Sequence, residues 1–178
     1  MPKKSTPTLE LVLHPVRLRI LNAMSGGRTA TTSELCARMP DQAQATVYRH
    51  VALLLRGGLL EVEEEQQVRG AVERRYRVLR DRSKIGPEIA AAMSLEEHRL
   101  GFTAAMAALI GEFNTYLDRE GAQPFADLVS YRQATLWLDE KELAGLARTM
   151  QKTVMALLKK KPKPGRRAYR TSLILFPE

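Results

Sequence analysis

The 178-residue chain has little of several residue types, and each shortage excludes a class of protein. It has a single cysteine, Cys36, so an intramolecular disulfide and any site built from four cysteines are excluded. It has no run of about 18 apolar residues, so no segment is predicted to span a bilayer. The N-terminal residues lack the long apolar stretch of a secretion signal, and we therefore expect a cytoplasmic protein.

The composition that remains is typical of a globular protein, with 44% hydrophobic and 27% charged residues. The 28 lysines and arginines outnumber the 20 aspartates and glutamates, which gives a formal net charge of +8. This charge divides into +5 for residues 1–82, −3 for residues 83–158 and +6 for residues 159–178. A basic first part favours a polyanionic partner such as nucleic acid.

Two helices are predicted in the first forty residues. Pro15 suits the first turn of a helix whose apolar positions continue to Met24, where a double glycine follows. Thr31 and Glu34 have the spacing of a capping box, in which each side chain binds the backbone N–H of the other residue. The capping box predicts a second helix, which ends before the next proline.

A third helix and a hairpin are predicted next. Asp41 is the predicted cap of a helix that ends at the double glycine 57–58. On a helical wheel the residues of its core face are Ala43, Val47, Val51 and Leu54. Segments 59–65 and 72–78 then have the pattern of two strands around a glycine-containing turn. The first strand is acidic and the second arginine-rich, which predicts ion pairs across the hairpin.

This order of elements is typical of a helix-turn-helix followed by a wing. The segments HPVRLRILNAM, SELCARM, ATVYRHVALLLRGGLLEV and ERRYRV resemble the ArsR-type winged-helix regulators of bacteria. The resemblance covers roughly residues 10–82 and implies that the third helix enters the major groove of DNA. It also implies that the wing lies along the DNA backbone or minor groove, and we predict a DNA-binding domain at 1–82.

The face of the third helix opposite the core carries the residues that we expect to contact DNA. Glutamine can address adenine, arginine can address guanine, and the methyl groups of threonine and alanine can contact thymine. The predicted base contacts are Gln42, Gln44, Ala45, Thr46 and Arg49, and Tyr48 is a predicted phosphate contact. In the wing the predicted phosphate or minor-groove contacts are Arg69, Arg74 and Arg75. The alternatives are a solvated helix face for the first set and neutralisation by Glu63–Glu65 for the second.

Three other residues of the third helix are interpreted differently. His50 lies at the edge of the core face, so we interpret it as a residue that packs or bonds to the backbone, and not as a ligand. Leu53 and Leu55 stand where related recognition helices carry polar residues, and they should pack on the second half of the chain or on a partner subunit. An interaction module that docks a protein through these two leucines is therefore the alternative to a reader of DNA sequence.

Residues 83–178 have the pattern helix–strand–helix–strand, so the predicted fold class of the chain is mainly α (α+β). A capping box at 94–97 starts the first helix, and segment 125–138 is a predicted strand. A capping box at 139–142 starts the second helix, and segment 168–176 is the last predicted strand. The Trp-Leu-Asp-Glu helix start and the closing Leu-x-Leu-Phe-Pro are similar to the C-terminal halves of some ArsR-like regulators.

We expect this second half, 83–178, to form a homodimer and to receive a small-molecule effector. The predicted effector-pocket residues are Met93, Phe102, Met106, Phe113, Tyr116 and Trp137. An ordinary hydrophobic core is the alternative interpretation of these side chains. The basic segment 159–167 fits a solvated loop, a second phosphate contact or attachment to anionic lipid.

No metal site, cofactor or catalytic centre is predicted. Cys36 has no second cysteine, and His14, His50 and His98 lack partners at the spacing of a metal site. The chain has no phosphate-binding loop, nucleophile elbow or dinucleotide fingerprint, so an enzyme is not expected. The sequence predicts a homodimeric regulator that binds pseudo-palindromic, double-stranded operator DNA and no membrane.

Overall fold

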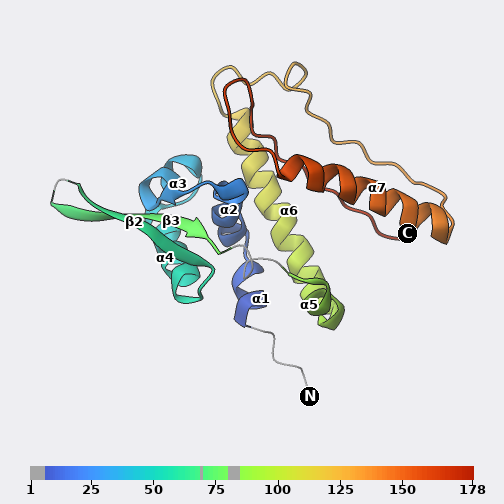
Figure 1. Cartoon of the computed structure of the whole chain (residues 1–178), viewed down its shortest axis with the longest axis horizontal. Coiled ribbons are helices and arrows are strands. Elements are labelled where there is room, and N and C mark those ends of the chain that lie inside the picture. Colours follow the sequence, from blue (N-terminus) through green and yellow to red (C-terminus); the bar gives the residue numbers. More distant parts are fainter. Residues whose placement is uncertain (1–6, 69, 80–84) are drawn as a thin grey trace. The chain divides into compact units, whose positions relative to one another are not determined.

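The structure, a computed structural model, describes residues 7–68, 70–79 and 85–178. It confirms the mainly α (α+β) class, because helices dominate and the strands form one small antiparallel sheet (Figure 1). By packing, the chain forms two compact units, residues 1–130 and 131–178. The predicted functional boundary at residues 82–83 lies outside the described residues and stays a prediction.

The predicted helices of the first half are present, together with short elements that the sequence pattern did not indicate. The helical elements are α1 (Pro7–Val12), α2 (Pro15–Ala23), the 3₁₀ turn η1 (Ser25–Gly27), α3 (Thr32–Arg38) and α4 (Gln44–Arg56). Pro15 begins α2 as predicted, and the N–H of Val16 donates to Nδ1 of His14 at 3.2 Å. The capping box of Thr31 and Glu34 is formed at the start of α3.

The sheet consists of β1 (Ala30–Thr31), β2 (Leu60–Val68) and β3 (Ala71–Val78) in the order β1-β3-β2. The predicted hairpin is confirmed, and its outer part extends away from α3 and α4 in Figure 1. Val62 pairs with Tyr76 and Glu64 pairs with Arg75, so Glu63 is an extra residue in a β-bulge. The unpredicted strand β1 pairs with β3 and thereby joins the start of α3 to the wing.

The hydrophobic core cluster of the first unit is formed mainly by residues of α1 to α4 and of the sheet. Val47, Val51 and Leu54 are buried as predicted and anchor the inner face of α4. The prediction for Ala43 was wrong: the helix begins one residue later, so Ala43 is its N-cap and is exposed.

The first unit also contains α5 (Pro87–Ala92) and α6 (Leu95–Leu117), and α6 packs against α2. The predicted capping box of Ser94 and Glu97 starts α6. Ala104 and Ala108 are buried on the inner side of α6. Their small side chains allow the two helices to approach closely.

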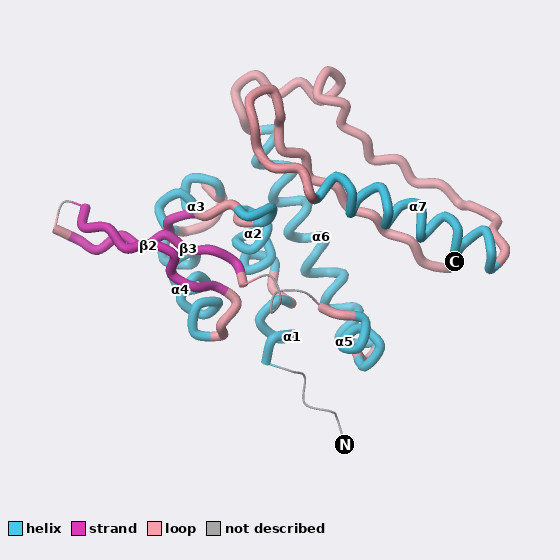
Figure 2. Tube along the Cα trace, viewed as in Figure 1, coloured by secondary structure: helices cyan, strands magenta, loops and turns pink. Residues whose placement is uncertain are grey.

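The second unit contains one helix, α7 (Glu140–Leu158), among its described residues, and the predicted capping box of Asp139 and Glu142 starts it. The two predicted strands, 125–138 and 168–176, are wrong. Figure 2 shows both segments as loop, and strands are confined to β1, β2 and β3 in the part of the chain that the structure describes. Strand-forming side chains need a partner strand to complete the hydrogen-bond ladder, and neither segment has one here.

Candidate nucleic-acid interface

The outer face of α4 brings together four of the predicted DNA contacts. Gln44, Ala45, Tyr48 and Arg49 are exposed, and Thr46 is half-buried. Among the described residues Arg49 makes no ion pair, so its guanidinium donors are free to bind an acceptor outside the chain. The three buried apolar residues on the opposite face hold this surface toward solvent.

The first turn of α4 has no side-chain cap, which differs from the sequence prediction. The N-cap is Ala43, which has no acceptor for the free N–H groups, so the positive end of the helix dipole remains exposed. The predicted cap, Asp41, instead accepts two hydrogen bonds from Arg19, at 2.6 Å from Nη1 and 2.7 Å from Nη2. The ion pair with Arg19 lowers the pKa of Asp41 to about 2.

Gln42, which was predicted to contact a base, lies before α4 and not on it. Its Nε2 donates to Oδ2 of Asp41 at 2.9 Å, so the side chain is held at the helix entrance. Gln42 also helps to line a hollow of about 370 Å³ on the surface between α3 and α4. The lining residues are Ser33, Cys36, Ala37, Pro40, Gln42, Gln44 and Tyr48. The hollow therefore belongs to the same surface as the exposed face of α4.

The arginines of the wing are neutralised by carboxylates. Arg74 pairs with Glu65 at 2.7 Å, and Arg77 pairs with Glu61, which confirms the predicted ion pairs across the hairpin. Both arginines are exposed, but a DNA phosphate would have to displace a carboxylate in order to bind either of them. Arg69 lies outside the described residues.

Arg75 has a different partner from the other two arginines of β3. It donates two hydrogen bonds to Glu34, of 3.0 and 2.8 Å, and Glu34 is the acidic residue of the α3 capping box. The hydrogen bond from Arg75 holds the pKa of Glu34 below its ordinary value. Arg75 therefore ties the wing to α3, a contact that the sequence pattern did not indicate.

On the inner side of α4, the ring of His50 lies close to the ring of His14. His50 is buried, as interpreted from the sequence, and its ring centroid is 4.4 Å from that of His14. Burial, with smaller contributions from His14, Arg17 and Arg49, lowers the pKa of His50 to about 4. Burial also lowers the pKa of His14, so both rings are neutral near pH 7.

The burial of Arg19 was not predicted from the sequence, because a charged side chain is normally expected at the surface. It follows the buried Val16 by three residues and precedes the buried Ile20, and it is itself only 5% exposed. An arginine within the apolar face of a helix needs an acidic partner, because an unpaired buried charge is very costly. That rule, applied to α2, would have predicted a carboxylate facing Arg19.

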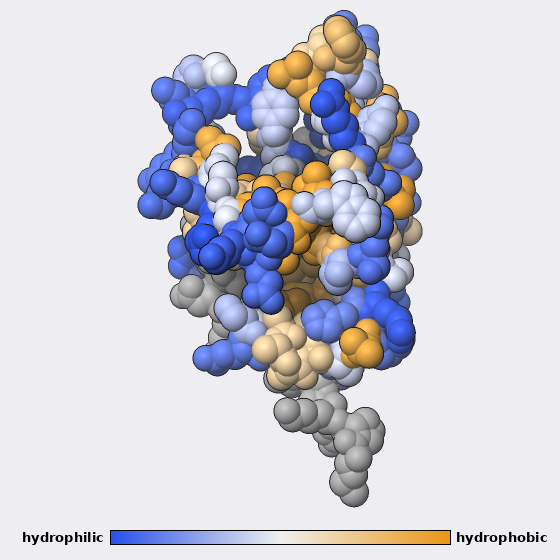
Figure 3. Space-filling model, turned by 90° about the vertical axis from the view of Figure 1, so that its right-hand side faces the viewer, coloured by the Kyte–Doolittle hydropathy of each residue, from blue (hydrophilic) through white to orange (hydrophobic). Residues whose placement is uncertain are grey.

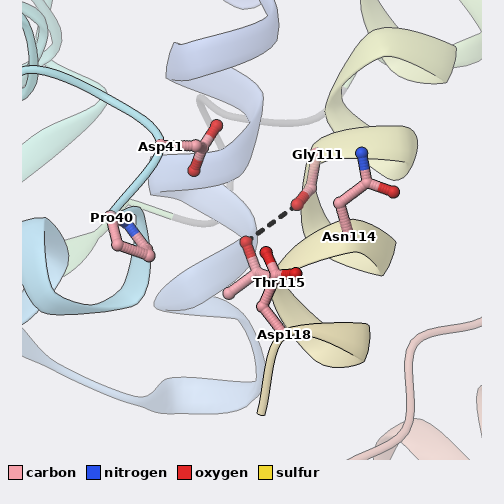
Figure 4. A pocket seen from close by; sticks show the side chains of 6 residues that line it. All are labelled: Pro40, Asp41, Gly111, Asn114, Thr115 and Asp118. Carbon is pink, nitrogen blue, oxygen red and sulfur yellow. Dashed lines mark hydrogen bonds between the residues drawn. The ribbon is translucent and has the colours of Figure 1, made fainter.

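The predicted effector-pocket residues are dispersed over the structure. Met93 packs against the core of the first unit, and Phe113 stacks with Tyr116 at a centroid distance of 6.0 Å. Phe102 is half-exposed and Met106 is half-buried on α6, whereas Trp137 belongs to the second unit and is 93% exposed. A second hollow, shown in Figure 4, has a volume of about 300 Å³ and is lined by none of these six residues.

Leu53 and Leu55 offer less apolar surface than the sequence suggests. Leu55 packs against the core of the first unit, and Leu53 is half-buried. Among the described residues, no group of three His, Cys, Asp or Glu side chains could hold a metal ion. None of the helices in the described ranges combines the length and the hydrophobicity needed to cross a membrane.

The first half of the chain is similar to a known protein family. Residues 12–63 match the family model of a helix-turn-helix domain. The matched stretch begins at the last residue of α1 and ends in β2, so it contains α3, α4 and the Arg19–Asp41 pair. A search of functionally curated proteins gave no match. The family match supports a helix-turn-helix DNA-binding domain, and it favours a regulator over an enzyme.

Proposed function

We propose that the protein is an ArsR-like transcriptional regulator that binds a pseudo-palindromic operator as a homodimer and responds to a small-molecule effector. Residues 1–82 would bind DNA, and residues 83–178 would form the dimer and receive the effector. A two-fold dimer would place two copies of α4 at half-sites about one helical turn, 10 base pairs, apart. Such a regulator would work in the cytoplasm of a bacterium.

The observation that carries this proposal is the exposed outer face of α4. A recognition helix must be fixed from behind while its polar side chains remain free, and α4 meets both conditions. Arg49 has the strongest claim to a base contact, because a guanidinium can donate two hydrogen bonds to guanine. Gln44 and Ala45 lie in the first turn of α4, and the exposed Tyr48 would contact a phosphate.

The test is fluorescence anisotropy of the full chain with fragments of the source genome. We expect Arg49→Ala to weaken specific binding by about 1–3 kcal/mol, or roughly 5- to 150-fold, and to relax sequence preference. Arg99→Ala is the matched control, since Arg99 is an exposed arginine of α6 paired with Glu96. An Arg49→Ala protein with wild-type affinity and sequence preference would refute the assignment of α4 as the reader.

The homodimer is supported by the second unit. None of its residues, 131–178, is buried, although it carries large apolar side chains that are more than half exposed. Among these are Tyr131, Trp137, Leu158, Tyr169 and Phe176. Figure 3 shows orange, hydrophobic residues at the surface on one face of the molecule. A segment of this size without a core needs another surface to cover it, and a second copy of the chain would supply one.

A further inference from the structure

Arg19 of α2 contacts two parts of the chain that are distant in sequence. It donates two hydrogen bonds to Asp41, which lies 22 residues later in the segment between α3 and α4. Its Nη2 also donates to Oγ1 of Thr115, at 3.2 Å and 96 residues away on α6. The Thr115 hydroxyl in turn donates to the carbonyl of Gly111 at 2.8 Å, as Figure 4 shows. One buried guanidinium thus joins α6 to the entrance of α4.

The guanidinium lies directly against the backbone of α6 at Gly111. A Cβ atom at this position would be 2.9 Å from Nη1 and 3.1 Å from Cζ of Arg19. The side chain has little freedom to move away, because Asp41 and Thr115 fix its far end. The position of Arg19 is therefore set by the surface of α6.

Asp41 connects Arg19 to the start of α4. Two hydrogen bonds from one guanidinium fix both the place and the plane of its carboxylate. The same carboxylate accepts from Gln42, and Ala43, the next residue along, is the N-cap of α4. A displacement of Arg19 would thus move the residues that lead into the recognition helix.

The hollow of Figure 4 lies between this segment and α6. It has a volume of about 300 Å³, and its lining comes from Pro40 and Asp41 on one side and from α6 on the other. Beside this hollow, the hydrogen bonds of Arg19 connect α6 to the segment between α3 and α4. A second polar contact, from Nδ2 of Asn22 to Oε1 of Glu112 at 2.9 Å, joins α2 to α6 one residue after Gly111.

We propose that Arg19 is a positioning residue through which α6 sets the orientation of α4, so that a displacement of α6 changes DNA affinity. This inference rests on the proposed DNA-binding function and assigns its regulation to a particular contact. Any effector or subunit contact that moves α6 would act on DNA binding through Arg19, Asp41 and the N-terminus of α4.

The decisive variant is Gly111→Ala, measured by anisotropy on the operator fragment that the wild-type protein binds. We expect the DNA affinity of this variant to be about 10-fold lower than that of the wild type. A change of this size is typical when one site of a protein alters binding at a distant site. The close contact of the added Cβ with Arg19 should also lower the melting temperature, because overpacking beside a buried side chain is destabilising. DNA binding is therefore measured at a temperature at which circular dichroism shows the variant to be folded. Gly145→Ala in α7 is the matched control, since nothing within 4 Å would meet its Cβ, and it should bind DNA as the wild type does.

A double-mutant cycle with Arg19→Lys tests the pathway. Lysine keeps the charge but cannot make the two-pronged bond or reach Gly111 in the same way. We therefore expect Arg19→Lys to weaken DNA binding, and Gly111→Ala to have little further effect in that background. Additive losses would overturn the proposal.

Thr115→Val gives an independent test that adds no volume beside Arg19. It removes the hydroxyl that accepts from Nη2, and we expect DNA affinity to fall about 3-fold in a folded protein. Wild-type affinity in both Thr115→Val and Gly111→Ala would overturn the inference while leaving the proposed function intact. Failure of the wild-type protein to bind any DNA fragment would instead refute the proposed function.

Discussion

His50 makes the stability of the protein depend on pH. The folded protein holds this histidine with a pKa of about 4, whereas the unfolded chain has the ordinary value of 6.5. Below pH 6.5 the unfolded chain binds a proton that the folded protein does not, so the free energy of unfolding should fall as the pH decreases toward 4. Above pH 6.5 this contribution should be constant, and the full effect is up to about 3 kcal/mol.

Urea unfolding between pH 4 and pH 8 measures this dependence. His50→Gln should flatten the slope between pH 4 and 6.5, since glutamine does not take up a proton. The same slope in the wild type and in His50→Gln would mean that His50 is not the group that titrates.

The wing is held to α3 by the pair of Arg75 and Glu34. Removing Arg75 breaks two charge-assisted hydrogen bonds and leaves Glu34 with only its capping role. Both side chains are partly exposed, so we expect Arg75→Ala to lower the free energy of unfolding by only about 1 kcal/mol. Arg74→Ala, at a more exposed pair, should cost less than about 0.5 kcal/mol. Equal losses in urea unfolding would contradict this difference between the two arginines.

Elements whose signals are local could be predicted from the sequence. The three capping boxes each depend on residues three positions apart, and all three start a helix as predicted. The exposed face of α4 followed from helical periodicity in the same way. Asp41 was misassigned as a cap because its true partner, Arg19, lies 22 residues away and competes for the same carboxylate.

Elements that depend on distant pairing could not be predicted. Segments 125–138 and 168–176 have the composition of strands, but composition does not specify a neighbouring strand. The two-residue strand β1 shows the converse case, because it exists only through its pairing with Tyr76 and Arg75 of β3. Likewise, no sequence pattern relates Arg19 to Thr115, so the connection between α6 and α4 emerges only from the fold.

For the whole molecule, Trp137 offers a direct measure of the proposed dimer. It is the sole tryptophan of the chain and is 93% exposed in the single chain. If the second unit forms the dimer interface, burial should shift its emission to shorter wavelength. Dilution through the dimer–monomer transition should then shift the emission to longer wavelength, in step with sedimentation velocity. Emission of an exposed indole from a protein that sediments as a dimer would place the interface elsewhere.

Because of the β-bulge at Glu63, the direction of the wing can change while the residue pairs between its two strands stay the same. An extra residue on one strand bends a hairpin and increases its local twist. Because Glu63 has no opposite residue, a chain that lacked it could still pair Val62 with Tyr76, Glu64 with Arg75 and Glu65 with Arg74. The outer half of the wing would then point along a different line with the same pairs intact. A change in chain length at this one position could therefore redirect the wing without any new contact having to evolve.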